Sequence, residues 1–171
     1  MNPIILAVNG KEPKITKSTF VAPNATIVGD VEMGEECSIW FGAVVRGDVN
    51  FIKMGNKVNI QDNATIHGTY QKAGTTLGNN VSIGHNACVH GCTIHDNVLI
   101  GMNAVVMDNT IIESYSIVAA GAVIPANTHI KSGELWAGVP AKKIKDVPTS
   151  LKEGEIERIA KNYTLYSSWF K

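Results

Sequence analysis

Residues 94–130 read IHDNVLIGMNAVVMDNTIIESYSIVAAGAVIPANTHI, with an aliphatic residue at every sixth position. A small residue follows most of these aliphatic residues four places later. A period of six fits neither the 3.6-residue repeat of an α-helix nor the alternation of a simple strand. It is typical of a parallel β-helix built from hexapeptide rungs. An earlier stretch keeps the same period in another phase, at Val21, Ile27, Met33, Ile39 and Val45.

The period of six predicts which residues are neighbours in space. Three rungs close one coil, so residues about eighteen apart stack in adjacent coils at roughly 4.8 Å, the spacing of paired strands. We therefore predict an all-β solenoid whose coils run from about residue 21 to residue 144. Two irregularities interrupt it: three extra residues at 51–53 and a loop at residues 68–76. Such interruptions are expected on the outside of a solenoid.

The two ends of the chain have a different character from the repeats. Residues 4–8 and 11–15 flank Asn9-Gly10, which predicts a hairpin with a type I′ turn that covers the first coil. After Pro148, Ser150 and Glu153 match a capping box, which predicts a helix start. Apolar residues then recur at spacings of three and four: Ile156, Ile159, Tyr163, Tyr166 and Phe170. We predict a β-helix over residues 1–148 and an amphipathic helix over residues 149–171, packed on the β-helix.

Composition excludes several classes of protein. The chain has 171 residues, 44% of them hydrophobic, and its fifteen basic and fifteen acidic residues give a formal charge of zero. No basic run exceeds Lys142-Lys143, so we expect neither nucleic acid nor a membrane surface as a partner. Residues 4–8 are too few for a signal sequence, and a cytoplasmic location is expected. Three cysteines without a Cys-x-x-Cys pair argue against a disulfide framework.

Two histidines occupy equivalent places in neighbouring coils. Ile66 and Val89 are three rungs apart, and His67 and His90 follow them directly. The two imidazoles should therefore stack about one strand spacing apart on the outer surface, close enough to share a metal ion. The same counting places Arg46 in this column, below His67.

His85 belongs to a different face of the coil. It is the second residue after Ile83, and His90 is the fifth residue after it, a distance of up to about 16 Å in extended chain. A metal ion held by His67, His85 and His90 therefore needs a second subunit, as in a threefold trimer. Three imidazoles leave a coordination position for water, as in catalytic zinc sites, where the pKa of bound water falls to near 7. His95 and His129 are interpreted as ordinary polar residues.

Several motifs together resemble those of the γ-class carbonic anhydrases, over nearly the whole chain. They are Arg46-Gly47-Asp48, the NIQDN stretch at residues 59–63, His67, and IGHNACVHG at residues 83–91. The resemblance implies a left-handed parallel β-helix and a homotrimer with zinc, iron or cobalt between subunits. It also implies that His67 and His90 of one subunit and His85 of its neighbour hold the metal. The implied reaction is reversible hydration of carbon dioxide to bicarbonate by a metal-bound hydroxide.

The resemblance also suggests roles for residues around the metal. Arg46 and Asp48 would form an ion pair at the trimer interface, where Arg46 attracts bicarbonate; a simple surface pair is the alternative. Asn59 belongs to the matching motif, and Gln61 would hydrogen-bond the metal-bound water. Asp62 falls in the column of His85 and would orient its imidazole. A loop-stabilising role for Gln61 and Asp62 stays open, and Tyr163 either reaches the site or belongs to the core.

The chain departs from active members of that family at the step of proton transfer. Those members carry a glutamate directly after Arg-Gly-Asp and an acidic loop after the first metal histidine. Here the first position is Val49, and residues 68–76 contain no carboxylate. Tyr70 is a poor substitute because its ordinary pKa is near 10. Turnover that is slow, buffer-dependent or absent is therefore expected.

Three other functions compete with this interpretation. A hexapeptide acyltransferase that uses a CoA thioester is supported by the repeat and by WAGVPAK at residues 136–142. A metal-dependent thioesterase would use the same water. A non-enzymatic scaffold role is supported by the missing carboxylates. Metal content separates the scaffold from the hydrolases, and the three clustered histidines count against the transferase.

Overall fold

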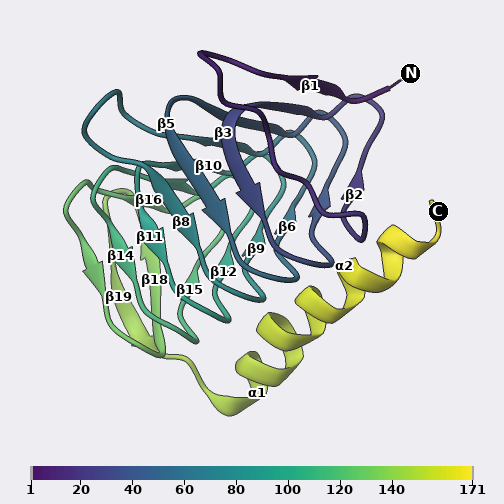
Figure 1. Cartoon of the computed structure of the whole chain (residues 1–171). Helices are drawn as coiled ribbons and strands as arrows, with labels where there is room; N and C mark the ends of the chain where they lie inside the picture. The colour runs from purple at the N-terminus through teal and green to yellow at the C-terminus, as the bar shows by residue number, and fades with distance from the viewer. Residues whose placement is uncertain (1, 171) are drawn as a thin grey trace.

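A computed structural model describes residues 2–170 of the chain; residues 1 and 171, which the predicted division includes, lie outside the described residues. Stacked coils form a parallel β-helix, and one helical segment lies along its side (Figure 1). The predicted solenoid with a C-terminal helix is confirmed. The division at residue 148 remains a prediction about domains, although helical structure does begin at Thr149.

Parallel strands line the three faces of the coils. The first face contains the start of β5 (Val44–Met54) with β7 (Thr65–His67), β10 (Cys88–His90), β13 (Val105–Val106) and β16 (Val123–Ile124). The second contains the end of β5 with β8 (Thr75–Leu77), β11 (Thr93–Ile94), β14 (Ile111–Ile112) and β17 (His129–Ile130). The third contains β2 (Phe20–Val21), β4 (Ser38–Ile39), β6 (Asn59–Ile60), β9 (Ser82–Ile83), β12 (Leu99–Ile100), β15 (Ile117–Val118) and β18 (Glu134–Gly138).

The aliphatic residue of each rung points into the coil. Ile100, Ile112 and Ile124 are fully buried, and the small residues Ala104 and Ser116 fill the space beside them. Because successive side chains of a strand point to opposite sides, the residues flanking each aliphatic residue face outward. The predicted six-residue pattern is thus the pattern of the core.

Asparagine is the commonest residue at the sharp turns between rungs. The turn residues have positive φ, between 55° and 62° at Asn63, Asn80, Asn86, Asn97, Asn103, Asn109 and Asn127. Asparagine enters this left-handed region more readily than other residues with a side chain. The turns therefore recur without a glycine at every corner.

The irregularity in β5 lies earlier than the sequence suggests. β3 (Thr26–Met33) pairs with β5 along both of the first two faces, with Gly29 opposite Gly47 and Val31 opposite Ile52. The extra residues therefore fall between Gly47 and Ile52, rather than at residues 51–53. Ile52 is fully buried and belongs to the regular core. This bulge also leaves Val49 only half-buried, although the repeat places it inside.

The ends of the solenoid correct two further expectations. Asn9 and Gly10 both have positive φ, and Val8 bridges Lys11, so the predicted tight turn is present. The preceding strand β1 (Ile4–Leu6), however, pairs in parallel with β3 of the first coil and not with residues 11–15. At the other end, β19 (Ala141–Asp146) runs antiparallel to β18. The coils therefore end near Gly138, before the predicted residue 144.

The helical segment covers the outer side of the third face. It consists of α1 (Thr149–Leu151), a π-helical turn η1 (Lys152–Glu157) and α2 (Arg158–Ser168). The predicted capping box is wrong: Pro148 occupies the N-cap position and no side chain caps the helix there. Tyr163 packs edge-on against Trp40 with ring centroids 5.2 Å apart, so the apolar stripe is covered by the chain's own coils.

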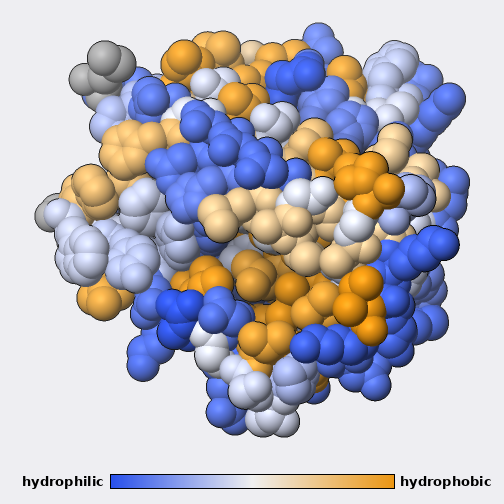
Figure 2. All heavy atoms as spheres, turned by 180° about the vertical axis from the view of Figure 1, so that it is seen from behind, coloured by the Kyte–Doolittle hydropathy of each residue, from blue (hydrophilic) through white to orange (hydrophobic). Residues whose placement is uncertain are grey.

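The surface combines charged and apolar areas. Seen from behind, hydrophobic residues gather around a central hollow and hydrophilic residues surround them (Figure 2). Large apolar side chains that remain exposed include Met102 and Met107. Within residues 2–170, no helix has the length and apolar character needed to cross a membrane.

Two neighbouring isoleucines of β14 test the direction of the rungs. Ile112 is fully buried and Ile111 is 39% exposed. Replacing Ile112 with alanine leaves a cavity, and we expect it to lower the free energy of unfolding by about 2–5 kcal/mol. The control, Ile111→Ala, removes the same atoms from the outer side and should cost less than about 1 kcal/mol. Thermal and urea unfolding measure both, and equal losses would contradict the inward direction of Ile112.

Candidate metal centre

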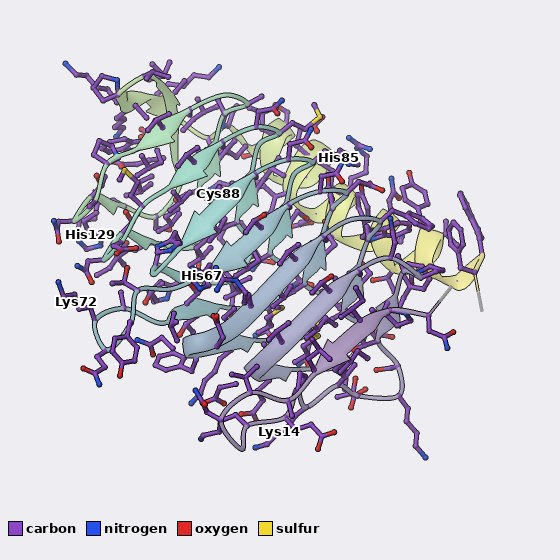
Figure 3. The ribbon with its side chains drawn as sticks, turned by 90° about the horizontal axis from the view of Figure 1, so that it is seen from above. Lys14, His67, Lys72, His85, Cys88 and His129 are labelled. Carbon is purple, nitrogen blue, oxygen red and sulfur yellow. The ribbon has the colours of Figure 1, made fainter. Side chains whose placement is uncertain are left out.

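His67 and His90 form a pair on the first face of the coils. His67 ends β7 and His90 ends β10, and the two residues are partners in the register of these strands. Their ring centroids lie 5.1 Å apart, and Nδ1 of His67 is 3.1 Å from Nε2 of His90. The predicted placement of the two histidines one above the other, about one strand spacing apart, is confirmed, although the rings meet edge-on with an interplanar angle of 63°. Figure 3 shows His67 among the strands of this sheet.

Each imidazole of the pair also contacts a carboxylate on its other side. Asp48 Oδ1 is 3.0 Å from Nε2 of His67, and Asp108 Oδ1 is 2.5 Å from Nδ1 of His90. An ionised carboxylate only accepts hydrogen bonds, so each neutral imidazole gives its single N–H to its aspartate. The two facing nitrogens then both carry lone pairs. Their approach to 3.1 Å becomes favourable when a cation lies between them.

Both aspartates are held in the ionised form. Desolvation acts to raise the pKa of Asp48, but hydrogen bonds from Arg46 and His67 lower it below its ordinary value overall. Arg46 Nη1 lies 2.5 Å from Asp48 Oδ2, so this ion pair forms within one chain. Desolvation also acts to raise the pKa of Asp108. Hydrogen bonds from Thr69 and His90 outweigh this effect, so the pKa of Asp108 lies below its ordinary value.

His85 belongs to a second group of residues, beside the helix. Its Nδ1 is 2.8 Å from Asp62 Oδ2, so the predicted contact between these two residues is present. Its Nε2 is 3.2 Å from the hydroxyl of Tyr163. Burial, with smaller contributions from Asp62 and Tyr166, raises the pKa of Tyr163 to about 12. Tyr163 is therefore a neutral hydroxyl that donates to Nε2 of His85.

Gln61 and Asn59 extend this second group. Both are buried; Gln61 Nε2 donates to Asn59 Oδ1 over 3.0 Å, and Asn59 Nδ2 donates to Ser82 Oγ over 2.8 Å. Beside them, a groove of about 450 Å³ runs between the third face and the helix. Its lining includes Gln61, His85, Leu99, Met102, Ile117, Ile159 and Tyr163.

The predicted site residues thus fall into two separate groups. Arg46, Asp48, His67 and His90 lie on the first face, and Asn59, Gln61, Asp62, His85 and Tyr163 lie along the third face and its helix. Figure 3 shows His67 and His85 well apart. Among residues 2–170, no three His, Cys, Asp or Glu side chains are grouped so as to hold a metal ion.

The donor set of the first group fits two of the ligands of a zinc ion. Tetrahedral zinc with Zn–N distances near 2.0–2.1 Å requires its nitrogen ligands to lie about 3.3 Å apart. The facing nitrogens of His67 and His90 are 3.1 Å apart, and both are unprotonated when each ring gives its N–H to its aspartate. Each ring is also fixed by a carboxylate at its other nitrogen, as is typical of metal-binding histidines.

Two residues near this pair escaped the sequence analysis. Asp108 lies one coil further along, two residues after Val106, which is the register partner of Val89. Thr69 Oγ1 donates to Asp108 Oδ2 over 2.5 Å. Counting rungs places Met107 beside His90 and gives no signal for Asp108, which is one residue further on. The position of Thr69 depends on how the irregular loop folds back. His129, by contrast, contacts Glu113 and Lys131 on the surface, in keeping with its interpretation as an ordinary residue.

Comparison with known proteins places the chain in a class. The family model described as Bacterial transferase hexapeptide (six repeats) matches residues 74–106 and 91–126. A crystal structure of a hexapeptide transferase family protein from Anaplasma phagocytophilum is 38% identical, with a TM-score of 0.93 and 98% of each chain covered. The chain is thus a hexapeptide-repeat protein.

Two curated relatives narrow the class to a family. The carbonic anhydrase of Geobacillus kaustophilus is 36% identical, and the match covers 98% of this chain and 91% of that protein. Gamma carbonic anhydrase 1, mitochondrial, of Arabidopsis thaliana is 42% identical over 96% of this chain. The chain spans 60% of that relative's length. This chain belongs to the γ-carbonic-anhydrase-like family within the hexapeptide-repeat superfamily.

Gly91, next to His90, tests how closely the site is packed. A Cβ at this position would lie 2.5 Å from Asp108 Oδ1 and 2.9 Å from Ala73 Cβ, and its φ is +54°. We expect Gly91→Ala to displace Asp108 and to lower the free energy of unfolding by about 1–3 kcal/mol more than Gly121→Ala. Gly121 is the matched control because its φ is +69° and nothing lies within 4 Å of its Cβ position. Equal unfolding midpoints for the two variants would contradict this packing.

Proposed function

We propose that this chain forms a homotrimer that hydrates carbon dioxide reversibly to bicarbonate with the help of a metal ion between subunits. The observation that carries the proposal is the 3.1 Å approach of the facing nitrogens of His67 and His90, while the other nitrogen of each ring contacts Asp48 or Asp108. His85 would supply the third nitrogen from a neighbouring subunit. A cytoplasmic location stays a prediction.

The metal would be zinc, with iron or cobalt as alternatives, because imidazole nitrogens suit all three. When bound, it would polarise a water molecule and lower the pKa of that water toward neutrality, which supplies the nucleophile for carbon dioxide. Asp48, Asp62 and Asp108 hold the three rings in the tautomers that leave one nitrogen unprotonated on each.

Other residues would bind the substrate and orient water. The guanidinium of Arg46 is partly exposed beside Asp48, where it can attract the bicarbonate anion. The amide of Gln61 and the neutral hydroxyl of Tyr163 both lie near His85. They would direct hydrogen bonds toward the reacting oxygen once a neighbouring subunit completes the site.

Among the described residues, few groups near His67 could accept the proton that the reaction releases. The loop that follows His67 contains no carboxylate, and its Tyr70 is 64% exposed with its hydroxyl bonded to Gln71. A buffer in solution must then accept the proton.

Thioester hydrolysis is a second candidate, and the groove beside His85 favours it. A volume of about 450 Å³ is far larger than carbon dioxide needs, and Leu99, Met102 and Ile117 give it apolar walls. The same activated water would attack a thioester carbonyl whose acyl chain lies in the groove. Hydrolysis of short acyl-CoA thioesters, measured beside carbon dioxide hydration with the same preparation, distinguishes the two.

Subunit complementation tests whether the site is shared between chains. His85→Ala alone should abolish metal binding and leave a folded trimer, and so should His67→Ala. In trimers assembled from an equal mixture of the two variants, one interface of each mixed trimer regains all three histidines, so about a quarter of the metal sites should return. Metal content after dialysis and the trimer's mass measure this.

The surface histidine offers a control for that experiment. His129→Ala, outside both groups, should keep full metal content. No recovery of metal in the mixed trimers would contradict a shared site, and loss of folding in His85→Ala would point to a structural role for that histidine.

Hydration of carbon dioxide should depend on the buffer. With zinc loaded, we expect the rate to rise several-fold as imidazole is increased, because the loop has no carboxylate to carry the proton away. Stopped-flow measurement with a pH indicator detects this, with His85→Ala in the same buffers as the blank. Val49→Glu should reduce the dependence by placing a carboxylate after Asp48. A rate that is fast and independent of imidazole would contradict the missing-carrier argument.

A further inference from the structure

The loop that follows His67 is tied to the outer side of His90. Thr69, in this loop, donates its hydroxyl hydrogen to Asp108 Oδ2, and the other oxygen of Asp108 lies 2.5 Å from Nδ1 of His90. Thr69, Asp108 and His90 are far apart in the sequence but form one continuous chain of hydrogen bonds. We call these three residues the Thr69 relay.

The loop itself is anchored independently of the relay. Asn50 Nδ2 donates to the carbonyl oxygen of Thr69 over 3.1 Å, and Thr69 bridges Ala73 across the turn. At the end of the loop, Thr75 Oγ1 donates to the carbonyl oxygen of His67 over 2.6 Å. The hydroxyl of Thr69 is therefore held in place by backbone contacts, which makes it a fixed point for Asp108.

Close packing leaves Asp108 little freedom to turn away. Gly91 lies beside it without a side chain, and a Cβ there would overlap Asp108 Oδ1 at 2.5 Å. The carboxylate of Asp108 lies against Gly91 on one side and accepts a hydrogen bond from the Thr69 hydroxyl on the other. These two contacts give it one preferred orientation. That orientation directs Oδ1 at Nδ1 of His90.

We propose that Thr69 and Asp108 are positioning residues for the metal: the loop sets the tautomer and tilt of His90 so that Nε2 faces His67. This inference rests on the proposed function, because it assumes that His67 and His90 bind a metal ion. It gives the carboxylate-free loop a different task from proton transfer. Partners of this kind typically contribute 10–100-fold to metal affinity.

Thr69→Val tests the relay because it replaces the hydroxyl with a methyl group of similar size. We expect the affinity for Zn²⁺ to fall by about tenfold, measured by competition with a chromophoric chelator. The visible spectrum of the Co²⁺-loaded trimer should change with it, since Asp108 no longer fixes the His90 ring. Asp108→Asn, which keeps the shape but not the charge, should weaken binding in the same direction.

Two matched variants separate positioning from general destabilisation. Thr69→Ser keeps the hydroxyl and should retain the affinity of the wild-type protein. Thr76→Val makes the same chemical change in the neighbouring strand β8, outside the relay, and should leave metal affinity unchanged. Unfolding midpoints of the metal-free proteins identify any variant whose affinity falls because the fold is damaged.

The outcomes distinguish this inference from the proposed function. A wild-type protein that binds metal, with Thr69→Val and Thr76→Val equal to it in affinity, would overturn the relay alone. A wild-type protein that binds no metal would overturn both. Weakened binding in Thr69→Val and full binding in Thr69→Ser, without any hydration of carbon dioxide, would support the relay and remove the proposed activity.

Discussion

The register between successive coils is the constraint on which the site depends. Backbone bonds such as Gly91 N–H to His67 O and Asn109 N–H to Gly91 O, at 3.1 and 2.8 Å, join three coils in one column. A slip of one residue would turn every outward side chain inward. The buried aliphatic residue of each rung prevents that slip, because a polar replacement would lose its contacts with water. Core packing therefore places the two histidines of the first face one above the other.

Electrostatics then turns this placement into a potential ligand set. Asp48, Asp108 and Asp62 each contact a different one of the three histidines. In a neutral ring the carboxylate takes the N–H, so the opposite nitrogen keeps its lone pair. The negative charges of these carboxylates would also compensate the positive charge of a bound divalent cation. An isolated histidine pair would have neither a defined tautomer nor this compensation, and it would bind a metal ion more weakly.

The sequence predicted what the repeat controls and missed what interrupts it. The stacking of His67 and His90 and the pairing of Asp62 with His85 follow from counting rungs, because the aliphatic residue marks each rung even in the coil that carries the loop. The bulge of β5 was misplaced, since Phe51 and Ile52 are both large and apolar and only their packing shows which one is buried. The capping box failed because Pro148, and not Ser150, occupies the N-cap position. Thr69 could not be placed at all, as its hydroxyl reaches Asp108 through a fold of the loop that has no period.

The division of the histidines between two faces has a consequence for assembly. Within one chain, Nε2 of His85 accepts a hydrogen bond from Tyr163, whereas the lone pairs of His67 and His90 have only each other. On the proposed function, association would exchange the Tyr163 bond, worth about 1 kcal/mol net, for a metal–nitrogen bond and would relieve the repulsion between the other two rings. Tyr163 would then be free to donate to the reacting oxygen. Metal binding and trimer formation should therefore strengthen each other, because each provides what the other needs.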